Sequence, residues 1–283
     1  MISDTKRKFD LVQLFKNHHR TIVMGVVNTT PDSFSDGGRF LDTDLAVAHA
    51  LRLIDEGADI IDIGGESSRP GSDPVNESEE LRRVIPVIEA LAGNIAVPIS
   101  VDTCKSAVAQ AAFEAGASII NDITALSGDQ KMAAVVARFD AGLVLMHMRG
   151  TPRAMQTNTV YADLIGEIRD SLAAAIRSAN SAGNDPNKIM IDPGIGFGKD
   201  AAGNLEIIKS IVRFAELGKP VLIGASRKSF IGRITGARTE NRLAGSLAVS
   251  VAAVLNGASA VRVHDVLETR QAVDVALQLR SQA

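Results

Sequence analysis

The chain has 283 residues, of which 46% are hydrophobic and 22% are charged, so it can bury a large core as one domain. Its net charge of −3 gives no reason to expect nucleic acid as a partner, and its one cysteine, Cys104, excludes an internal disulfide framework and fits a reducing compartment. No stretch is apolar for long enough to be a signal peptide or to span a bilayer, so we expect a cytoplasmic protein with no membrane partner.

Eight short apolar runs rich in branched residues follow one another along the chain, which is the pattern of parallel strands covered on both faces. They span residues 22–27, 60–63, 99–102, 119–122, 143–147, 189–192, 221–224 and 260–264. Amphipathic helical patterns occupy most of the intervals, at residues 44–56, 77–91, 105–115, 163–182, 204–217, 239–256 and 266–279. Several of these patterns stop at a glycine, as helices often do, and Pro86 is a candidate for a kink.

Repeated alternation of strand and helix predicts a closed (β/α)8 TIM barrel. We expect a single α/β domain over residues 1–283, with residues 1–20 as an N-terminal extension and the barrel from about residue 21. The alternative is an open doubly wound sheet. It is disfavoured because the glycines of 194–198 do not fit a dinucleotide fingerprint, in which Lys199 would have to be glycine.

Polar residues stand at the carboxyl end of nearly every predicted strand. In a barrel these ends meet at one face, where active sites of this architecture lie. Any one of them alone fits a turn residue, above all Asp192 before Pro193 and Gly194. As a set they predict a ligand site, and they comprise Asn28, the 64–71 loop, Asp102, Asn121, Asp122, His147, Asp192, Ser226, Arg227, Lys228, Arg262 and His264.

Arg262 and His264 are two residues apart on the last strand, so both side chains leave the same side of it. Val261 and Val263 then face the helices. A buried cation needs a partner, and we expect that partner to be an anionic ligand. The alternative is an internal ion pair with Asp102, Asp122 or Asp192. Lys228 and Arg69 add positive charge at the same face, which favours a phosphorylated or pyrophosphorylated ligand.

Asp192 and Asn121 suit a different part of the ligand. A carboxylate accepts two parallel hydrogen bonds and an amide offers a donor and an acceptor, so together they can bind the amino-pyrimidinone edge of a planar heterocycle. Asn28 offers a neutral oxygen to Mg²⁺ if phosphate and water supply the remaining ligands, and a turn residue is its alternative role.

Two long polar loops, at residues 29–40 and 66–74, have the composition of mobile lids, although their tips also fit plain surface connections. We expect Cys104 to be a packing residue with no chemical role. The alternative is a reactive thiol, because a helix that starts beside it would lower the pKa of the thiol. His147 fits either a pocket wall or a strand cap. His18, His19 and His49 have no expected site role.

The motifs at these positions, taken in order, resemble those of the dihydropteroate synthase family from Met24 to about Thr269. Two departures are visible: Ser68 stands where many members have Thr, and Arg149 where many have Gln. The matching segments are residues 24–38, 64–71, 100–103, 120–123, 146–148, 192–199, 226–232 and 262–265.

The resemblance implies a barrel transferase of folate biosynthesis that joins 6-hydroxymethyl-7,8-dihydropterin pyrophosphate to 4-aminobenzoate. It further implies Mg²⁺ as cofactor, a homodimer and membership of the sulfonamide target class. The alternatives are a methyltetrahydrofolate-binding methyltransferase domain, which has no need for the anion-binding residues, and a non-catalytic pterin-binding paralogue.

Site roles also come from the resemblance, by motif position. The catalytic set would be Asp192, Lys228, Arg262 and His264. The pterin pyrophosphate would contact Asn28, Ser68, Asp102, Asn121, Asp192, Lys228, Arg262, Val263 and His264, with Mg²⁺ at Asn28. The aminobenzoate side and its loops would include Phe34, Ser68, Arg69, Pro70, Phe197 and Ser226.

Overall fold

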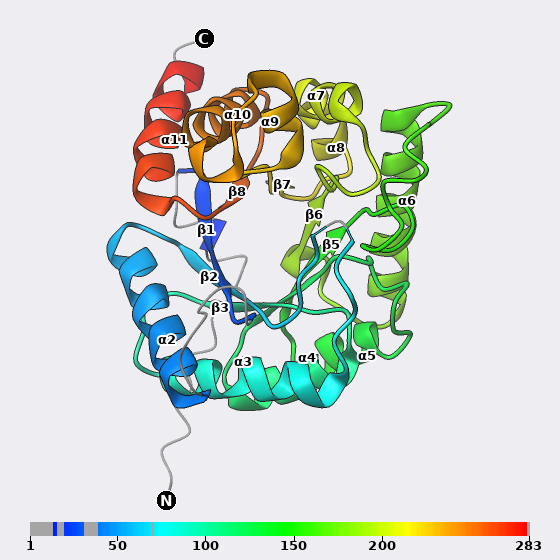
Figure 1. Cartoon of the computed structure of the whole chain (residues 1–283). Coiled ribbons are helices and arrows are strands. Elements are labelled where there is room, and N and C mark those ends of the chain that lie inside the picture. The colour runs from blue at the N-terminus through cyan, green and yellow to red at the C-terminus, as the bar shows by residue number, and fades with distance from the viewer. Residues whose placement is uncertain (1–13, 16–19, 31–38, 70, 282–283) are drawn as a thin grey trace, which may run out of the picture.

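The computed structural model describes residues 14–15, 20–30, 39–69 and 71–281. Within them, eight parallel strands run side by side in the order β6-β5-β4-β3-β2-β1-β8-β7 (Figure 1). A bridge between Ile191 and Val221 joins the two ends of this order and closes the cylinder, which confirms the predicted (β/α)8 barrel. The strands are β1 (Ile22–Asn28), β2 (Ile60–Gly64), β3 (Ile99–Asp102), β4 (Ile119–Asp122), β5 (Gly142–Met146), β6 (Ile189–Asp192), β7 (Leu222–Ile223) and β8 (Ala260–Val263).

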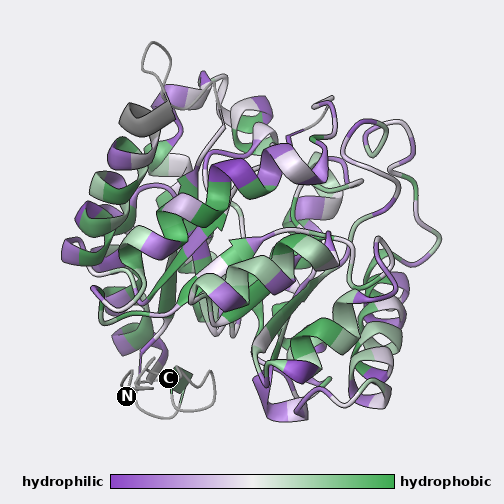
Figure 2. Cartoon of the chain, turned by 90° about the horizontal axis from the view of Figure 1, so that it is seen from below, coloured by the Kyte–Doolittle hydropathy of each residue, from purple (hydrophilic) through white to green (hydrophobic). Residues whose placement is uncertain are grey.

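The helices form a ring around the strands, with polar residues outward and apolar residues toward the barrel (Figures 1 and 2). None of those within the described ranges is long and apolar enough to cross a membrane. They are α2 (Arg39–Asp55), α3 (Glu77–Leu91), α4 (Ser106–Ala115), α5 (Met132–Arg138), α6 (Leu164–Ser181), α7 (Ala201–Lys209), α8 (Ile211–Ala215), α9 (Ser229–Thr235), α10 (Leu243–Leu255) and α11 (Val266–Ser281).

The helices differ from the prediction in four places, the first of which is α2, because it starts at Arg39 rather than at residue 44. The short helices α5 and α9 were missed, because seven residues hold too few turns for a periodic pattern. The predicted helix over 204–217 starts earlier, after the capping residue Asp200, and divides at Ser210 into α7 and α8. Residues Thr239–Asn241 form a separate 3-10 turn, so α10 begins later than expected.

The barrel is filled in layers, because alternate residues of each strand face its interior. One buried cluster inside the cylinder consists of apolar side chains from seven of the eight strands, and a larger cluster fills the space between the strands and the helices. Further toward the carboxyl ends the inward positions turn polar, beginning with Asp62 and Ser100, which face each other on β2 and β3 and are fully buried. The inner cluster is Ile22, Met24, Ile60, Ile119, Val144, Met190, Leu222 and Ala260.

Candidate active site

The carboxyl ends of the strands bring together most of the side chains that the sequence singled out. Asp102, Asn121 and Asp192 are the last or next-to-last residues of β3, β4 and β6, and each is almost fully buried. Asn28 ends β1, and its Oδ1 and Asp102 Oδ2 each lie 3.9 Å from where a Cβ on Gly64 would stand. The carboxylates and amides therefore lie at one mouth of the cylinder.

Arg262, on β8, is paired inside the protein. Its Nε donates to Asp62 Oδ2 at 2.6 Å and its Nη2 donates to Asp102 Oδ2 at 2.8 Å. Burial alone would lower its pKa, but these two carboxylates more than offset burial and raise the pKa. The internal ion pair that the sequence analysis gave as the alternative is therefore formed, with Asp102 as expected and with Asp62 in addition. Contact of Arg262 with an anionic ligand stays a prediction.

Asp62 is a site residue that the sequence analysis missed. Its side chain is fully buried, and Oδ2 also accepts a hydrogen bond from Asn121 Nδ2 at 3.1 Å. Oδ1 has no hydrogen-bond partner among the residues that the structure describes. One carboxylate thus orients both Arg262 and Asn121. The sequence did offer a sign of it, because Asp62 is a charge between two isoleucines inside a predicted buried strand.

Asp192 has two roles, one for each oxygen. Oδ1 accepts from the Gly194 main-chain N–H at 2.7 Å, so the turn-residue interpretation is right for that oxygen. Oδ2 faces across the mouth, 3.7 Å from where a Cβ on Gly224 would stand, and Arg262 lies on the other side of that position. Burial raises the pKa of Asp192, and it also raises the pKa of Asp102 to about 7.

Lys228 reaches the mouth from the loop that follows β7. Its Nζ lies 4.1 Å from the centre of the Phe197 ring, a cation–π contact that joins two residues predicted for different substrates. Burial, together with the nearby charge of Arg262, lowers the pKa of Lys228 to about 8. The ammonium is thus partly desolvated and is ready to bind an anion.

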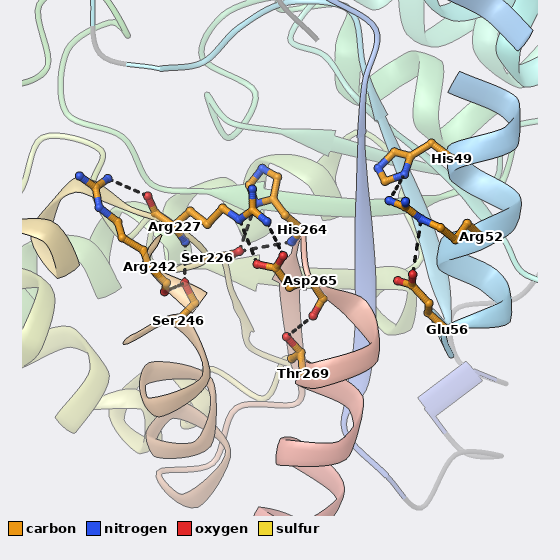
Figure 3. A network of polar contacts seen from close by, with 10 residues as sticks. All are labelled: His49, Arg52, Glu56, Ser226, Arg227, Arg242, Ser246, His264, Asp265 and Thr269. Atoms are coloured by element: carbon orange, nitrogen blue, oxygen red, sulfur yellow. Dashed lines mark hydrogen bonds and ion pairs between the residues drawn. The ribbon is translucent and has the colours of Figure 1, made fainter. Parts of the chain in front are cut away.

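His264 follows β8 and is held by Ser226, whose Oγ lies 3.1 Å from Nδ1 and accepts from the His264 main-chain N–H at 3.3 Å (Figure 3). Next to them Arg227, with a left-handed backbone (φ 56°), is paired with Asp265. Burial lowers the pKa of His264 to about 4, so the imidazole is neutral near pH 7 without a ligand.

A cavity of about 520 Å³ opens beside His264 and Asn28, between β1 and α2. His49 lines it, and its ring hydrogen-bonds Arg52 at 2.9 Å (Figure 3). His49 therefore lies on a helix, as expected, and this helix brings it to the cavity beside Asn28 and His264. The complete lining is Val26, Asn28, Leu45, Ala48, His49, Arg52 and His264.

The remaining predicted residues lie around this mouth or outside the described ranges. Ser226 contacts His264, as described above, whereas the Val263 side chain packs in the core between barrel and helices, so only its main chain can face a ligand. Arg69 is exposed and Ser68 is partly buried in the loop after β2. Phe34, Pro70 and residues 31–38 of the first loop lie outside the described residues.

The structure gives the surroundings of three side chains whose roles the sequence left open. His147 Nδ1 lies 2.9 Å from Lys199 Nζ, and burial lowers the pKa of His147 to about 3. Arg149 stacks on Tyr161, with 3.4 Å between its Cζ and the ring centre, and is paired with Glu167. Cys104 precedes α4 by two residues, and burial raises the pKa of its thiol to about 11, so no helix start activates it.

Comparison with known proteins gives the class of this site and then its family. The chain matches the family model described as pterin binding enzyme over residues 24–264, so the barrel is that of a pterin-binding enzyme. The dihydropteroate synthase of Clostridium beijerinckii is 46% identical over 259 residues, which are 91% of this chain and 94% of the relative. The chain therefore belongs to the dihydropteroate synthase family, as its motifs predicted.

Solved structures agree with that family. Xanthomonas albilineans dihydropteroate synthase with 4-aminobenzoic acid is 47% identical, with a TM-score of 0.87 over 93% of this chain and 94% of that one. Yersinia pestis dihydropteroate synthase in a sulfonamide drug complex is 43% identical, with a TM-score of 0.88 over 93% of this chain and 95% of that one.

Proposed function

We propose that this protein joins 6-hydroxymethyl-7,8-dihydropterin pyrophosphate to 4-aminobenzoate and releases 7,8-dihydropteroate and pyrophosphate. One observation carries the proposal: acids and amides that fit a pterin ring share a single barrel mouth with cations that fit a diphosphate. Asp102, Asn121 and Asp192 form the first group, and Lys228 and His264 provide the second.

The pterin binds through the buried acids. Asp192 accepts from the amino group and the adjacent ring N–H of the pterin through its two oxygens, because Oδ1 keeps a second lone pair beside the one that the Gly194 N–H uses. Asn121, oriented by Asp62, contacts the other edge of the ring. Arg262 lies between these groups with its charge balanced by Asp62 and Asp102, so a neutral ring enters without meeting an unpaired buried charge.

The diphosphate binds toward Lys228 and His264, and bond breaking at the pterin methylene is helped there. As the C–O bond breaks, negative charge moves onto the leaving diphosphate and positive charge develops on the methylene. Lys228 donates to the departing oxygens, and His264 can take up a proton once the anion lies beside it. The neutral aryl amine then attacks the methylene carbon, and its proton passes to solvent or to pyrophosphate, so a strong general base is not needed.

Magnesium fits the end of the site where the diphosphate binds. Among the described residues no three His, Cys, Asp or Glu side chains are grouped closely enough to hold a metal. The protein instead offers the neutral Oδ1 of Asn28, at the end of β1. Such an oxygen suits an ion that takes its remaining ligands from diphosphate and water. Bound there, Mg²⁺ would neutralise charge on the leaving group.

The aminobenzoate site lies at the rim, bordered by Phe197, Ser226 and the 66–74 loop, and a sulfonamide drug would compete for it.

The protein works in the cytoplasm as a homodimer. Several apolar side chains of α10 and α11 are exposed, which supports a dimer interface at these helices. They are Leu255, Leu267, Val275 and Leu279. Light scattering that gives the mass of one chain at micromolar concentration would contradict the dimer.

The deciding experiment measures pyrophosphate release from the pterin pyrophosphate with 4-aminobenzoate and Mg²⁺, and identifies dihydropteroate by mass. Reactions without 4-aminobenzoate, and with the Asp192→Asn variant, are the controls. Release that depends on both substrates supports the proposal. Pterin binding without turnover would leave only a pterin-binding protein, and methyl transfer from methyltetrahydrofolate would indicate the other enzyme class.

A further inference from the structure

The loop between β6 and α7 carries two groups of the site, with Asp192 at its start and Phe197 near its end. It contains three glycines in the left-handed region, Gly194 (φ 73°), Gly196 (φ 85°) and Gly198 (φ 73°). Glycine is conformationally permissive, so the backbone of this loop does not by itself restrict the loop to one shape. Contacts from other segments must therefore hold Asp192 and Phe197 in place.

Lys199 supplies those contacts from inside the protein. Its side chain is only 2% exposed. Its Nζ donates to the carbonyl oxygens of Pro193 and Gly194, both at 2.8 Å, and to the carbonyl oxygen of His147 at 3.0 Å. It also lies 2.9 Å from His147 Nδ1. Lys199 thus provides donors at the point where the ladder between β5 and β6 has ended.

The two segments that Lys199 joins are in close contact. The main-chain N–H of His147 donates to the Asp192 carbonyl at 2.9 Å. A Cβ on Gly194 would lie 1.9 Å from the His147 carbonyl oxygen, so no side chain fits between the segments. The Gly194 N–H at this contact is the one that binds Asp192 Oδ1. A shift of the turn would therefore rotate the Asp192 carboxylate.

We propose that Lys199 is a positioning residue of the substrate site, which fixes the Asp192 turn and the Phe197 wall against the end of β5 before any substrate binds. The inference rests on the function proposed above. A buried lysine next to peptide carbonyls, with no carboxylate within ion-pair distance in the described structure, makes sense if its donors hold a glycine-rich loop.

The geometry makes the expected effect selective. Asp192 and Phe197 lie at the two ends of the loop that Lys199 holds, between β6 and α7. Asn28 and His264 come instead from β1 and the end of β8, on another side of the mouth. Lys228 contacts Phe197 but is carried by the loop after β7, so its position does not depend on Lys199. Loss of the Lys199 donors should therefore weaken binding of the pterin and of 4-aminobenzoate, and leave binding of the diphosphate nearly unchanged. A general loss of structure would weaken all three.

The test uses Lys199→Met, which keeps the length of the side chain and removes its donors. Calorimetry measures binding of 6-hydroxymethylpterin and, separately, of inorganic pyrophosphate with Mg²⁺, and steady-state kinetics give KM for 4-aminobenzoate and kcat. The matched control is Lys188→Met, which removes a lysine at the other end of β6 that donates to the Asp140 carbonyl at 2.9 Å. If Lys199→Met does not fold, Lys199→Gln, which keeps two donors, takes its place.

We expect at least tenfold weaker pterin binding and at least fivefold higher KM for 4-aminobenzoate, with pyrophosphate affinity within twofold of wild type. Lys188→Met should change none of these constants by more than twofold. Pterin affinity within twofold of wild type, or an equal loss for pterin and pyrophosphate, would overturn the role of Lys199. Absence of pterin binding by the wild-type protein would instead refute the proposed function itself.

Discussion

Removal of the Asp62 carboxylate is the most direct test of how the barrel interior supports the site. In an Asp62→Ala variant, Arg262 loses the acceptor of its 2.6 Å Nε bond and Asn121 loses the acceptor of its 3.1 Å bond. A hydrogen bond to a charged group contributes about 1.5–3 kcal/mol and a neutral one about 1 kcal/mol. Arg262 keeps Asp102, so the loss should stay at the lower end of the range for a broken buried pair, about 3 kcal/mol.

The assay is the free energy of unfolding from urea titration, followed by circular dichroism. The matched control is a double-mutant cycle with Arg262→Met, which removes the cation as well. Because an apolar replacement of a whole buried pair is close to neutral, the double variant should lose less stability than the sum of the two single variants. A single-variant loss below about 1 kcal/mol, or strict additivity in the cycle, would refute the idea that Asp62 holds Arg262.

Three further predictions concern the ligand and the thiol. Asp192→Asn should weaken hydroxymethylpterin binding by about 2–3 kcal/mol, because a charged acceptor is lost in a buried site, and wild-type affinity in calorimetry would contradict that role. Arg262→Ala leaves the buried acids Asp62 and Asp102 without their cation, and their charge then repels an anion. It should therefore weaken binding of the pterin pyrophosphate at least tenfold more than binding of the bare hydroxymethylpterin, and equal losses in paired titrations would exclude an electrostatic role of Arg262 at the diphosphate. The Cys104 thiol, with a pKa of about 11, should react with iodoacetamide at pH 8 at least 50-fold more slowly than free cysteine and faster as pH rises, since roughly 0.1% of it is thiolate there against roughly a quarter of free cysteine. Labelling at the rate of free cysteine would contradict that protonation state.

The sequence predicted the strands and the polar mouth well, because both depend on local patterns. A strand buried on both faces is a continuous apolar run, and in this chain the run stops where the side chains reach the mouth. Asp102, Asn121 and Asp192 each stand at such a stop, and each lies in the site. The two-residue spacing of Val261 and Val263 likewise predicted their packing against the helices.

The partners of these residues were not predictable in the same way. Asp62 and Arg262 are 200 residues apart, and only closure of the barrel brings them together. The chain pattern showed a cation that needed an anion but did not show which anion. Lys199 was similarly judged only by its place after three glycines, although its contacts with His147 depend on how two neighbouring loops pack. His49 was given no site role, because helix periodicity alone does not show which face of α2 lines a cavity.

The brevity of β7 has a consequence for the electrostatics of the mouth. Between β6 and β7 the cylinder is closed by one bridge, whereas β1 and β2 share five paired positions. Asp192 ends the strand on one side of this joint, and Lys228 follows the strand on the other. A small widening between β6 and β7 therefore changes the distance between Asp192 and Lys228 without breaking the pairing of the other strands. Small changes in barrel shape thus alter the electrostatic field at a bound ligand.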